Sequence, residues 1–159
     1  MPAEDGRAAL TILGGYLGSG KSTWLRHQLR AGDLAGADVV VNEAAGTPVD
    51  DLLLDGARTL TVLAGGCACC EGRDALIAAL RGWCDRRVAG AGGRRLVLET
   101  SGLADPARIL DAVRADPVLV HHLRIDRTIV TADAGNVLAQ LATEPLGWRQ
   151  LEAADEIVL

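Results

Sequence analysis

Short, continuously apolar segments alternate with segments of helical periodicity, and this alternation restricts the possible folds more than any other feature. Strands are predicted at Ala8–Leu13, Ala37–Val41, Arg58–Leu63, Arg95–Glu99, Arg124–Thr131 and Glu156–Leu159. These segments are too apolar to leave one face of a sheet in water. A mainly parallel sheet avoids this exposure, because each β-α-β connection lays a helix over one of its faces. We therefore expect an α/β fold of three layers, with the sheet flanked by helices.

Helices are expected between these strands, where apolar residues recur at helical spacing and glycine or proline stands at the boundaries. The predicted helices are Ser22–Ala31, Arg73–Val88, Ala107–Arg114, Asn136–Ala142 and Trp148–Ala154, with a helical turn at Asp50–Leu54. The 159 residues, 49% of them apolar, suit one domain with a sizeable core.

Charge and hydropathy exclude two classes of partner. The formal net charge of −5 argues against a nucleic-acid-binding domain, which normally carries a basic surplus. No apolar run approaches the 18 or more residues of a membrane span, and the acidic start at Glu4 and Asp5 is not a signal peptide. We expect a cytoplasmic protein, in which the four cysteines are reduced and available for metal binding.

The segment Gly15-Tyr-Leu-Gly-Ser-Gly-Lys-Ser22 fits the phosphate-binding pattern G-x-x-x-x-G-K-[ST]. Glycines let the backbone wrap a phosphate, and the following helix adds the positive end of its dipole. The alternative is a simple glycine turn, but Lys21, the only lysine of the chain, occupies the required position. The pattern therefore predicts a P-loop NTPase fold. The candidate nucleotide-binding residues are Gly15, Gly18, Ser19, Gly20, Lys21, Ser22 and Thr23.

A P-loop site also needs an acidic residue near Mg²⁺. Lys21 is expected to neutralise the β- and γ-phosphates, and the Ser22 hydroxyl to hold Mg²⁺. Glu99 ends an apolar strand and is the first candidate to bind a magnesium-bound water. Asp50 is a second candidate, although an acidic residue at a helix N-terminus explains it equally well. The N–H of Gly102 is placed to sense the γ-phosphate, as switch loops do.

Three of the four cysteines lie within the loop that follows the third predicted strand. Cys67, Cys69 and Cys70 are flanked by glycines that allow a tight backbone, and three sulfurs are soft ligands suited to Zn²⁺ or Cu⁺. Buried small hydrophobes or a redox pair are the alternatives; the polar glycine loop favours metal. We expect Glu43 as a further ligand, since it follows the second strand. Cys84 would lie about 20 Å along the next helix and is expected to pack in the core.

The phosphate loop and the cysteine loop are expected to share one edge of the sheet, because the carboxyl ends of parallel strands meet there. The loops that follow the first four strands would then be neighbours. A γ-phosphate orders switch segments and its loss releases them. Nucleotide state is therefore hypothesised to control metal binding.

With these motifs in hand, the chain closely resembles the CobW family of P-loop GTPase metallochaperones, relatives of the GTPases that insert nickel into urease and hydrogenase. The matching strings are Gly14–Thr23, Val41-Asn-Glu43, Gly66-Cys-Ala-Cys-Cys70 and Glu99-Thr-Ser-Gly-Leu-Ala-Asp-Pro106. The resemblance implies GTP hydrolysis with Mg²⁺, coupled to delivery of zinc or cobalt (Zn²⁺ or Co²⁺) to a client protein. It also implies that Lys21 and Ser22 bind phosphate and Mg²⁺, that Glu99 is the Walker B acid, and that Cys67, Cys69 and Cys70 bind the metal. A homodimer is also considered as the assembly.

The chain departs from the family pattern in two places. The family's Asn-Glu-Phe-Gly-Glu run reads Asn42-Glu-Ala-Ala-Gly46 here, so the second glutamate is absent. Residues 1–159 are expected to form a P-loop GTPase domain that stops before the family's guanine-recognition motif and C-terminal domain, so the choice of guanine rests on the resemblance. Two other functions are considered: a metal-binding or interaction module without turnover, and an ATP-dependent phosphotransferase, which leaves the cysteines unexplained.

Overall fold

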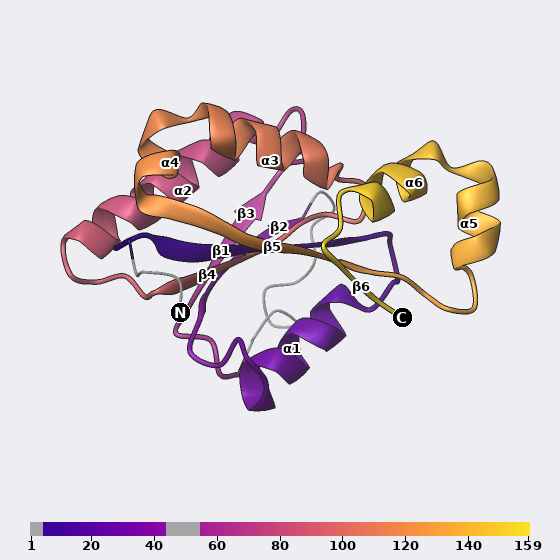
Figure 1. Cartoon of the computed structure of the whole chain (residues 1–159), viewed down its shortest axis with the longest axis horizontal. Helices are drawn as coiled ribbons and strands as arrows, with labels where there is room; N and C mark the ends of the chain where they lie inside the picture. Colours follow the sequence, from indigo (N-terminus) through magenta and orange to yellow (C-terminus); the bar gives the residue numbers. More distant parts are fainter. Residues whose placement is uncertain (1–4, 44–54) are drawn as a thin grey trace.

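The structure, a computed structural model, describes residues 5–43 and 55–159. Within these residues one sheet of six strands has the order β3-β2-β4-β1-β5-β6, and every neighbouring pair is parallel (Figure 1). The strands are β1 (Ala8–Gly15), β2 (Asp38–Glu43), β3 (Thr59–Ala64), β4 (Arg95–Glu99), β5 (Leu123–Thr131) and β6 (Glu156–Val158). The predicted parallel α/β sheet is confirmed.

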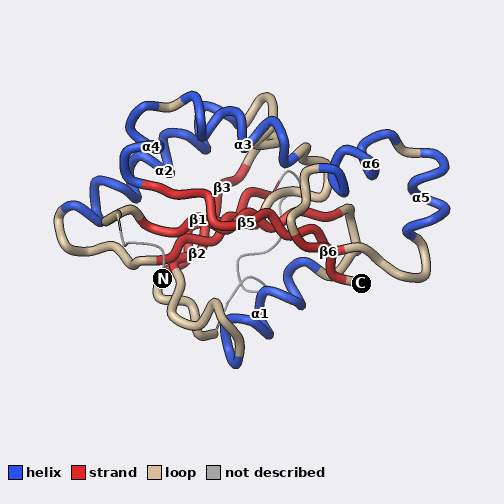
Figure 2. Tube along the Cα trace, in the orientation of Figure 1, coloured by secondary structure: helices blue, strands red, loops and turns tan. Residues whose placement is uncertain are grey.

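Helices cover both faces of the sheet, as its apolar strands require. They are α1 (Lys21–Ala31), α2 (Arg73–Val88), α3 (Pro106–Ala115), α4 (Pro117–His122), α5 (Val137–Thr143) and α6 (Pro145–Glu152). Helix α1 lies below the sheet in the view of Figure 2, whereas α2, α3 and α4 lie above it. Helices α5 and α6 lie beyond the end of the sheet at which β1 stops (Figures 1 and 2). None of the helices among the described residues has the length and apolarity needed to cross a membrane.

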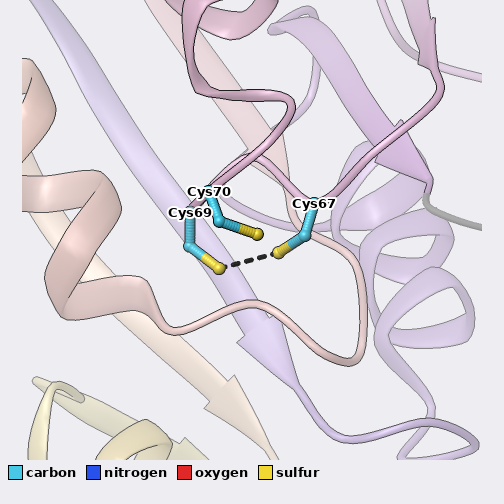
Figure 3. Close-up of side chains that lie close together, drawn as sticks. All are labelled: Cys67, Cys69 and Cys70. Carbon is cyan, nitrogen blue, oxygen red and sulfur yellow. Dashed lines mark hydrogen bonds between the residues drawn. The ribbon is translucent and has the colours of Figure 1, made fainter.

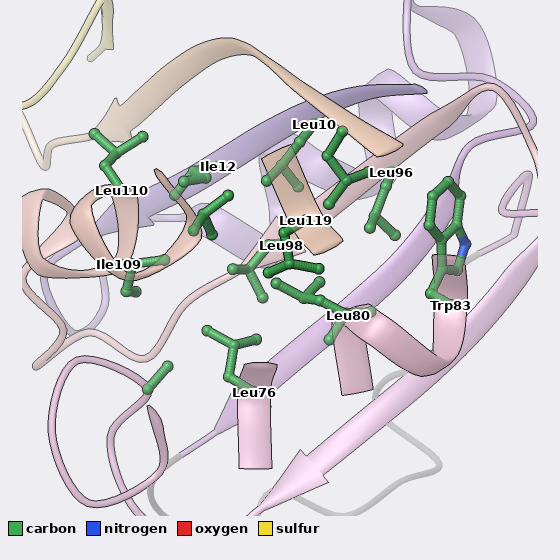
Figure 4. Packing of buried hydrophobic residues seen from close by; sticks show 14 of the residues in the cluster. Leu10, Ile12, Leu76, Leu80, Trp83, Leu96, Leu98, Ile109, Leu110 and Leu119 are labelled. Atoms are coloured by element: carbon green, nitrogen blue, oxygen red, sulfur yellow. The ribbon is translucent and has the colours of Figure 1, made fainter. Parts of the chain in front are cut away.

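The core consists of two apolar clusters, one on each face of the sheet. The larger cluster fills the space under α2, α3 and α4, with Leu76 and Leu80 of α2 against Leu98 of β4 (Figure 4). The smaller cluster joins Leu25 and Leu29 of α1 to the opposite face. Each fully buried leucine contributes about 1.5–3 kcal/mol relative to an exposed one, so these clusters hold the helices against the sheet.

Two helices differ from the sequence prediction. Helix α4 was not predicted; Asp116 caps it by accepting hydrogen bonds from the N–H groups of Val118 and Leu119, both at 3.0 Å. Helix α6 was predicted to begin at Trp148, but it begins at Pro145, whose fixed φ suits the first helical position. The helical turn predicted at residues 50–54 lies outside the described residues.

Asp38, at the start of β2, joins several elements at the edge of the sheet opposite to the phosphate loop. Its buried carboxylate accepts hydrogen bonds from Thr59 Oγ1 (2.7 Å), Trp83 Nε1 (2.9 Å) and Gly93 N (2.8 Å), and Arg58 Nε lies 3.0 Å away. Burial raises the pKa of this carboxyl, but the hydrogen bonds and the Arg58 charge outweigh it and leave the pKa below its ordinary value. Asp38 therefore ties β2, β3, α2 and the approach to β4 together.

We expect Asp38→Asn to lower the free energy of unfolding by about 2–3 kcal/mol near neutral pH, because buried donors lose a charged acceptor. The pKa of Asp38 is lowered in the folded state, so its contribution is present above the unfolded pKa of about 3.9 and is lost as pH falls through the folded value. Urea unfolding of both proteins should therefore show a difference that is constant near neutral pH and shrinks below about pH 4. A difference that stays constant in acid would contradict this role.

Candidate functional site

The phosphate loop connects the end of β1 to the start of α1. Gly20 caps α1 with a left-handed backbone (φ 90°), so the first N–H groups of the helix face the loop. Lys21 Nζ donates to the carbonyl oxygens of Gly15 (2.7 Å) and Tyr16 (3.3 Å). The cation and the positive end of the helix dipole are thus at the same place, where they favour an anion.

The loop is fastened to the end of β5 by a side chain that the sequence reasoning missed. Thr131 Oγ1 lies 2.7 Å from Ser19 Oγ, so one hydroxyl donates to the other. Gly15 makes this approach possible, because a Cβ there would collide with Thr131 and lie 2.7 Å from Ser19 Oγ. The signal in the sequence is a threonine that ends the apolar strand β5, at the same edge of the sheet as the loop.

Glu99 and Ser22 belong to different elements and are in direct contact. Glu99 ends β4, in register with Leu13 of β1 and Val41 of β2, and Ser22 is in the first turn of α1. Ser22 Oγ donates to Glu99 Oε1 at 2.7 Å, and Glu99 is buried. A hydroxyl and a carboxylate are hard oxygen donors, which is the chemistry that Mg²⁺ prefers. The two residues therefore fit a magnesium site, although they are 77 positions apart.

The loop that follows β4, residues 100–105, lies directly against the phosphate loop. Thr100 donates to the carbonyl oxygen of Leu13 through both its N–H (2.9 Å) and its hydroxyl (3.1 Å). A Cβ at Gly102 would lie 2.6 Å from the backbone nitrogen of Leu17, so only glycine allows this approach. Gly102 therefore lies beside the phosphate loop. Its predicted contact with a γ-phosphate stays a prediction.

The thiols of Cys67, Cys69 and Cys70 point toward one another (Figure 3), and their Sγ atoms all lie within 4.8 Å of one another. Cys67 Sγ and Cys69 Sγ are 2.8 Å apart. Burial, together with the hydrogen bond to Cys69, raises the pKa of the Cys67 thiol to about 12. Cys67 is therefore protonated near neutral pH without a metal, and binding of a metal ion has to release its proton. Cys70 is exposed, so one side of the cluster is accessible.

The cysteine loop is fixed to the sheet and to the core. Asn42, near the end of β2, accepts from Ala68 N at 3.0 Å and donates to Gly66 O at 3.4 Å. Ala68 is fully buried in the larger core cluster, which also contains Ala104 of the loop after β4. The cysteine loop and the loop after β4 therefore share one packed cluster, and the sequence reasoning did not predict that link.

The remaining predicted residues have different outcomes. Cys84 lies in α2, fully buried in the larger cluster, as predicted, and burial raises the pKa of its thiol to about 11. The backbone of Glu43 pairs with Ala64 at the end of β2, beside the strand that leads into the cysteine loop. The Glu43 side chain and Asp50 lie outside the described part of the chain, so their predicted roles stay predictions.

Residues 9–159 match the family model described as "CobW/HypB/UreG, nucleotide-binding domain". The zinc chaperone YjiA of Escherichia coli (strain K12) is 35% identical over 153 residues, which cover 95% of this chain and 48% of that protein. The zinc-regulated GTPase metalloprotein activator 1 of Schizosaccharomyces pombe is 30% identical over 160 residues, covering 94% of this chain and 38% of that protein.

A solved structure gives the same relationship. The crystal structure of the Zn(II)-bound YjiA GTPase from E. coli aligns with a TM-score of 0.66 and 28% identity, over 95% of this chain and 48% of that chain. The chain thus spans about half the length of YjiA, and less of the fission yeast protein. The three-layer fold and the phosphate loop agree with this relationship.

The separation of Cys84 from the thiol cluster predicts the behaviour of Cys84→Ser. The substitution places a hydroxyl among apolar side chains and should lower the free energy of unfolding by about 1–3 kcal/mol. The amount of zinc bound per chain should stay that of the wild type, because Cys84 is a core residue. Urea unfolding and zinc titration with a chromophoric chelator check both parts. Loss of bound zinc from a folded Cys84→Ser protein would show that the ligand set is wrong.

Proposed function

The chain belongs to the CobW/HypB/UreG nucleotide-binding domain family, and from this premise we propose that it binds and hydrolyses GTP and thereby controls a transition metal, zinc or cobalt, which it passes to a client protein. The observation that carries the proposal is the packing of the cysteine loop and the loop after β4 into one cluster, through Ala68 and Ala104. Both loops thus pack against the same core, through which a change in one loop would reach the other.

The nucleotide is proposed to lie along the N-terminus of α1. Its phosphates would accept hydrogen bonds from the N–H groups of residues 16–23, among them Gly18, Ser19, Gly20 and Thr23. Lys21 would turn from the carbonyl oxygens that it now contacts toward the β- and γ-phosphates. The preference for guanine is proposed from the family alone.

Ser22 and Glu99 are proposed to hold Mg²⁺, Ser22 directly and Glu99 through a bound water. The ion would neutralise charge on the β- and γ-phosphates. The contribution of the chain itself is to keep these two oxygens 2.7 Å apart before the nucleotide arrives, on a strand end and a helix start that the core fixes. Asp50 is proposed to orient the attacking water.

The metal to be delivered is proposed to bind to Cys67, Cys69 and Cys70, with Glu43 as a fourth ligand. Three thiolates suit zinc and other soft or borderline metals. The separation of the sulfurs, all within 4.8 Å, supports a single ion. Zinc is favoured over cobalt because the names of two relatives specify zinc.

Lys21→Ala is expected to weaken binding of a non-hydrolysable GTP analogue by about 10- to 100-fold, because one charge-assisted contact to phosphate is lost. GTP turnover should fall with it, whereas zinc affinity should stay within about twofold. Isothermal titration and phosphate release measure these quantities. Arg30→Ala is the control, because it removes a cation from the exposed end of the same helix. Its nucleotide affinity and its GTP turnover should equal those of the wild type. GTP turnover of Lys21→Ala equal to that of the wild type would contradict the proposed GTPase activity.

Cys69→Ala should have the opposite pattern. Removal of one thiolate is expected to weaken zinc binding by more than about 100-fold, since loss of a partner outside the ligand set already costs 10- to 100-fold. Binding of GDP should stay close to that of the wild type. Chelator competition gives the zinc affinity. Cys84→Ala is the matched control, because it also removes one thiol but lies in the core. Unchanged zinc affinity in Cys69→Ala would exclude the proposed ligands.

A further inference from the structure

Gln150, on α6, donates a pair of hydrogen bonds to the backbone of the loop after β4. Its side chain is 2% exposed, and Nε2 donates to the carbonyl oxygens of Gly102 (3.1 Å) and Ala104 (3.0 Å). The two acceptors lie 48 and 46 positions earlier in the chain, in the loop after β4. Burying an amide is costly unless it is hydrogen-bonded, so this contact ties α6 firmly to one particular arrangement of that loop.

The loop that Gln150 holds is fixed on its other sides as well. Thr100 fastens its start to Leu13, and Asp105 caps α3 at its end by accepting from Ala107 N. Arg149, the neighbour of Gln150, lies 3.5 Å from Asp105. The middle of the loop, around Gly102, is a turn in which Ser101 accepts from Leu103 N through its hydroxyl (3.2 Å) and from Ala104 N through its carbonyl (3.0 Å). Gln150 contacts this turn from one side, and the phosphate loop contacts it from the other.

Gly102 is therefore confined between two contacts. The backbone nitrogen of Leu17 would lie 2.6 Å from a Cβ at this position, and the Gly102 carbonyl oxygen accepts from Gln150. Tyr16 and Thr131 line the same small cavity as Gln150, so this side chain lies beside the phosphate loop as well. The Gly102 backbone thus lies between Gln150 and the phosphate loop.

We propose that Gln150 is a positioning residue that orients the Gly102 peptide toward the γ-phosphate and so lets the site distinguish a nucleoside triphosphate from a diphosphate. This inference rests on the proposed nucleotide binding. Linkage makes the effect reciprocal: a γ-phosphate that holds Gly102 also strengthens the contact between the loop and α6.

The test compares two nucleotides in Gln150→Met, which keeps the length of the side chain but removes the donor. Affinity for a non-hydrolysable GTP analogue should fall about tenfold, while affinity for GDP should stay within about twofold. Asp155→Ala is the control. It removes a different side-chain-to-backbone bond of the same segment, the one accepted from Thr128 N at 2.7 Å, and should keep the triphosphate preference of the wild type. If Gln150 has only a structural role, Gln150→Met should lower the affinities for both nucleotides by the same factor. That result would overturn the inference.

The wild-type measurements separate the possible failures. If the wild type binds neither nucleotide, the proposed function fails, and the inference fails with it. If the wild type prefers the triphosphate and Gln150→Met keeps that preference, only the inference fails.

Hydrogen exchange on the wild-type chain gives a test that does not depend on folding of the variant. The GTP analogue should slow exchange in residues 102–104 and 147–152 together, relative to GDP. Protection of residues 102–104 without any change in residues 147–152 would overturn the inference.

Discussion

The parallel direction of the strands is the constraint on which the site depends. Because β1, β2, β3 and β4 all run the same way, the loops that follow them leave from one edge of the sheet. The phosphate loop, the cysteine loop and the loop after β4 therefore open on the same edge of the sheet, with β4 next to β1 and β2 between β4 and β3. Contacts such as that between Ser22 and Glu99 then refine an arrangement that the sheet has already imposed.

Shared packing is the physical basis of the proposed coupling between the nucleotide site and the thiol cluster. Ala68 lies between Cys67 and Cys69, and Ala104 lies two residues after Gly102; both are fully buried in the larger core cluster. Tightly packed interiors do not deform smoothly, so a displaced loop has to shift its packed neighbours or be resisted by them. Under the proposed function, a nucleotide that holds or releases Gly102 would act on the core cluster against which the cysteine loop packs.

The sequence predicted those features that depend on neighbouring residues. The phosphate loop, the cysteine cluster and the apolar strands are local patterns, and Glu99 could be assigned because it ends one of those strands. The contacts of Asn42 with the cysteine loop and of Gln150 with Gly102 join residues far apart in the chain, so no local pattern indicates them. Thr131, which contacts Ser19, ends an apolar strand as Glu99 does, but its partner could not be read from that position. Helix α4 is a different case, because the pair Asp116-Pro117 is a usual local signal for the start of a helix.

The central claim is that the nucleotide controls how tightly the thiol cluster binds its metal. The most direct measurement is the zinc dissociation constant of the chain, determined by chelator competition, once with a saturating non-hydrolysable GTP analogue and once with saturating GDP. If the nucleotide controls metal binding, the two constants differ by at least about fivefold, the lower end of typical coupling between sites, and Lys21→Ala abolishes the difference. Equal constants in the wild type would contradict it, since a ligand without differential affinity shifts no equilibrium.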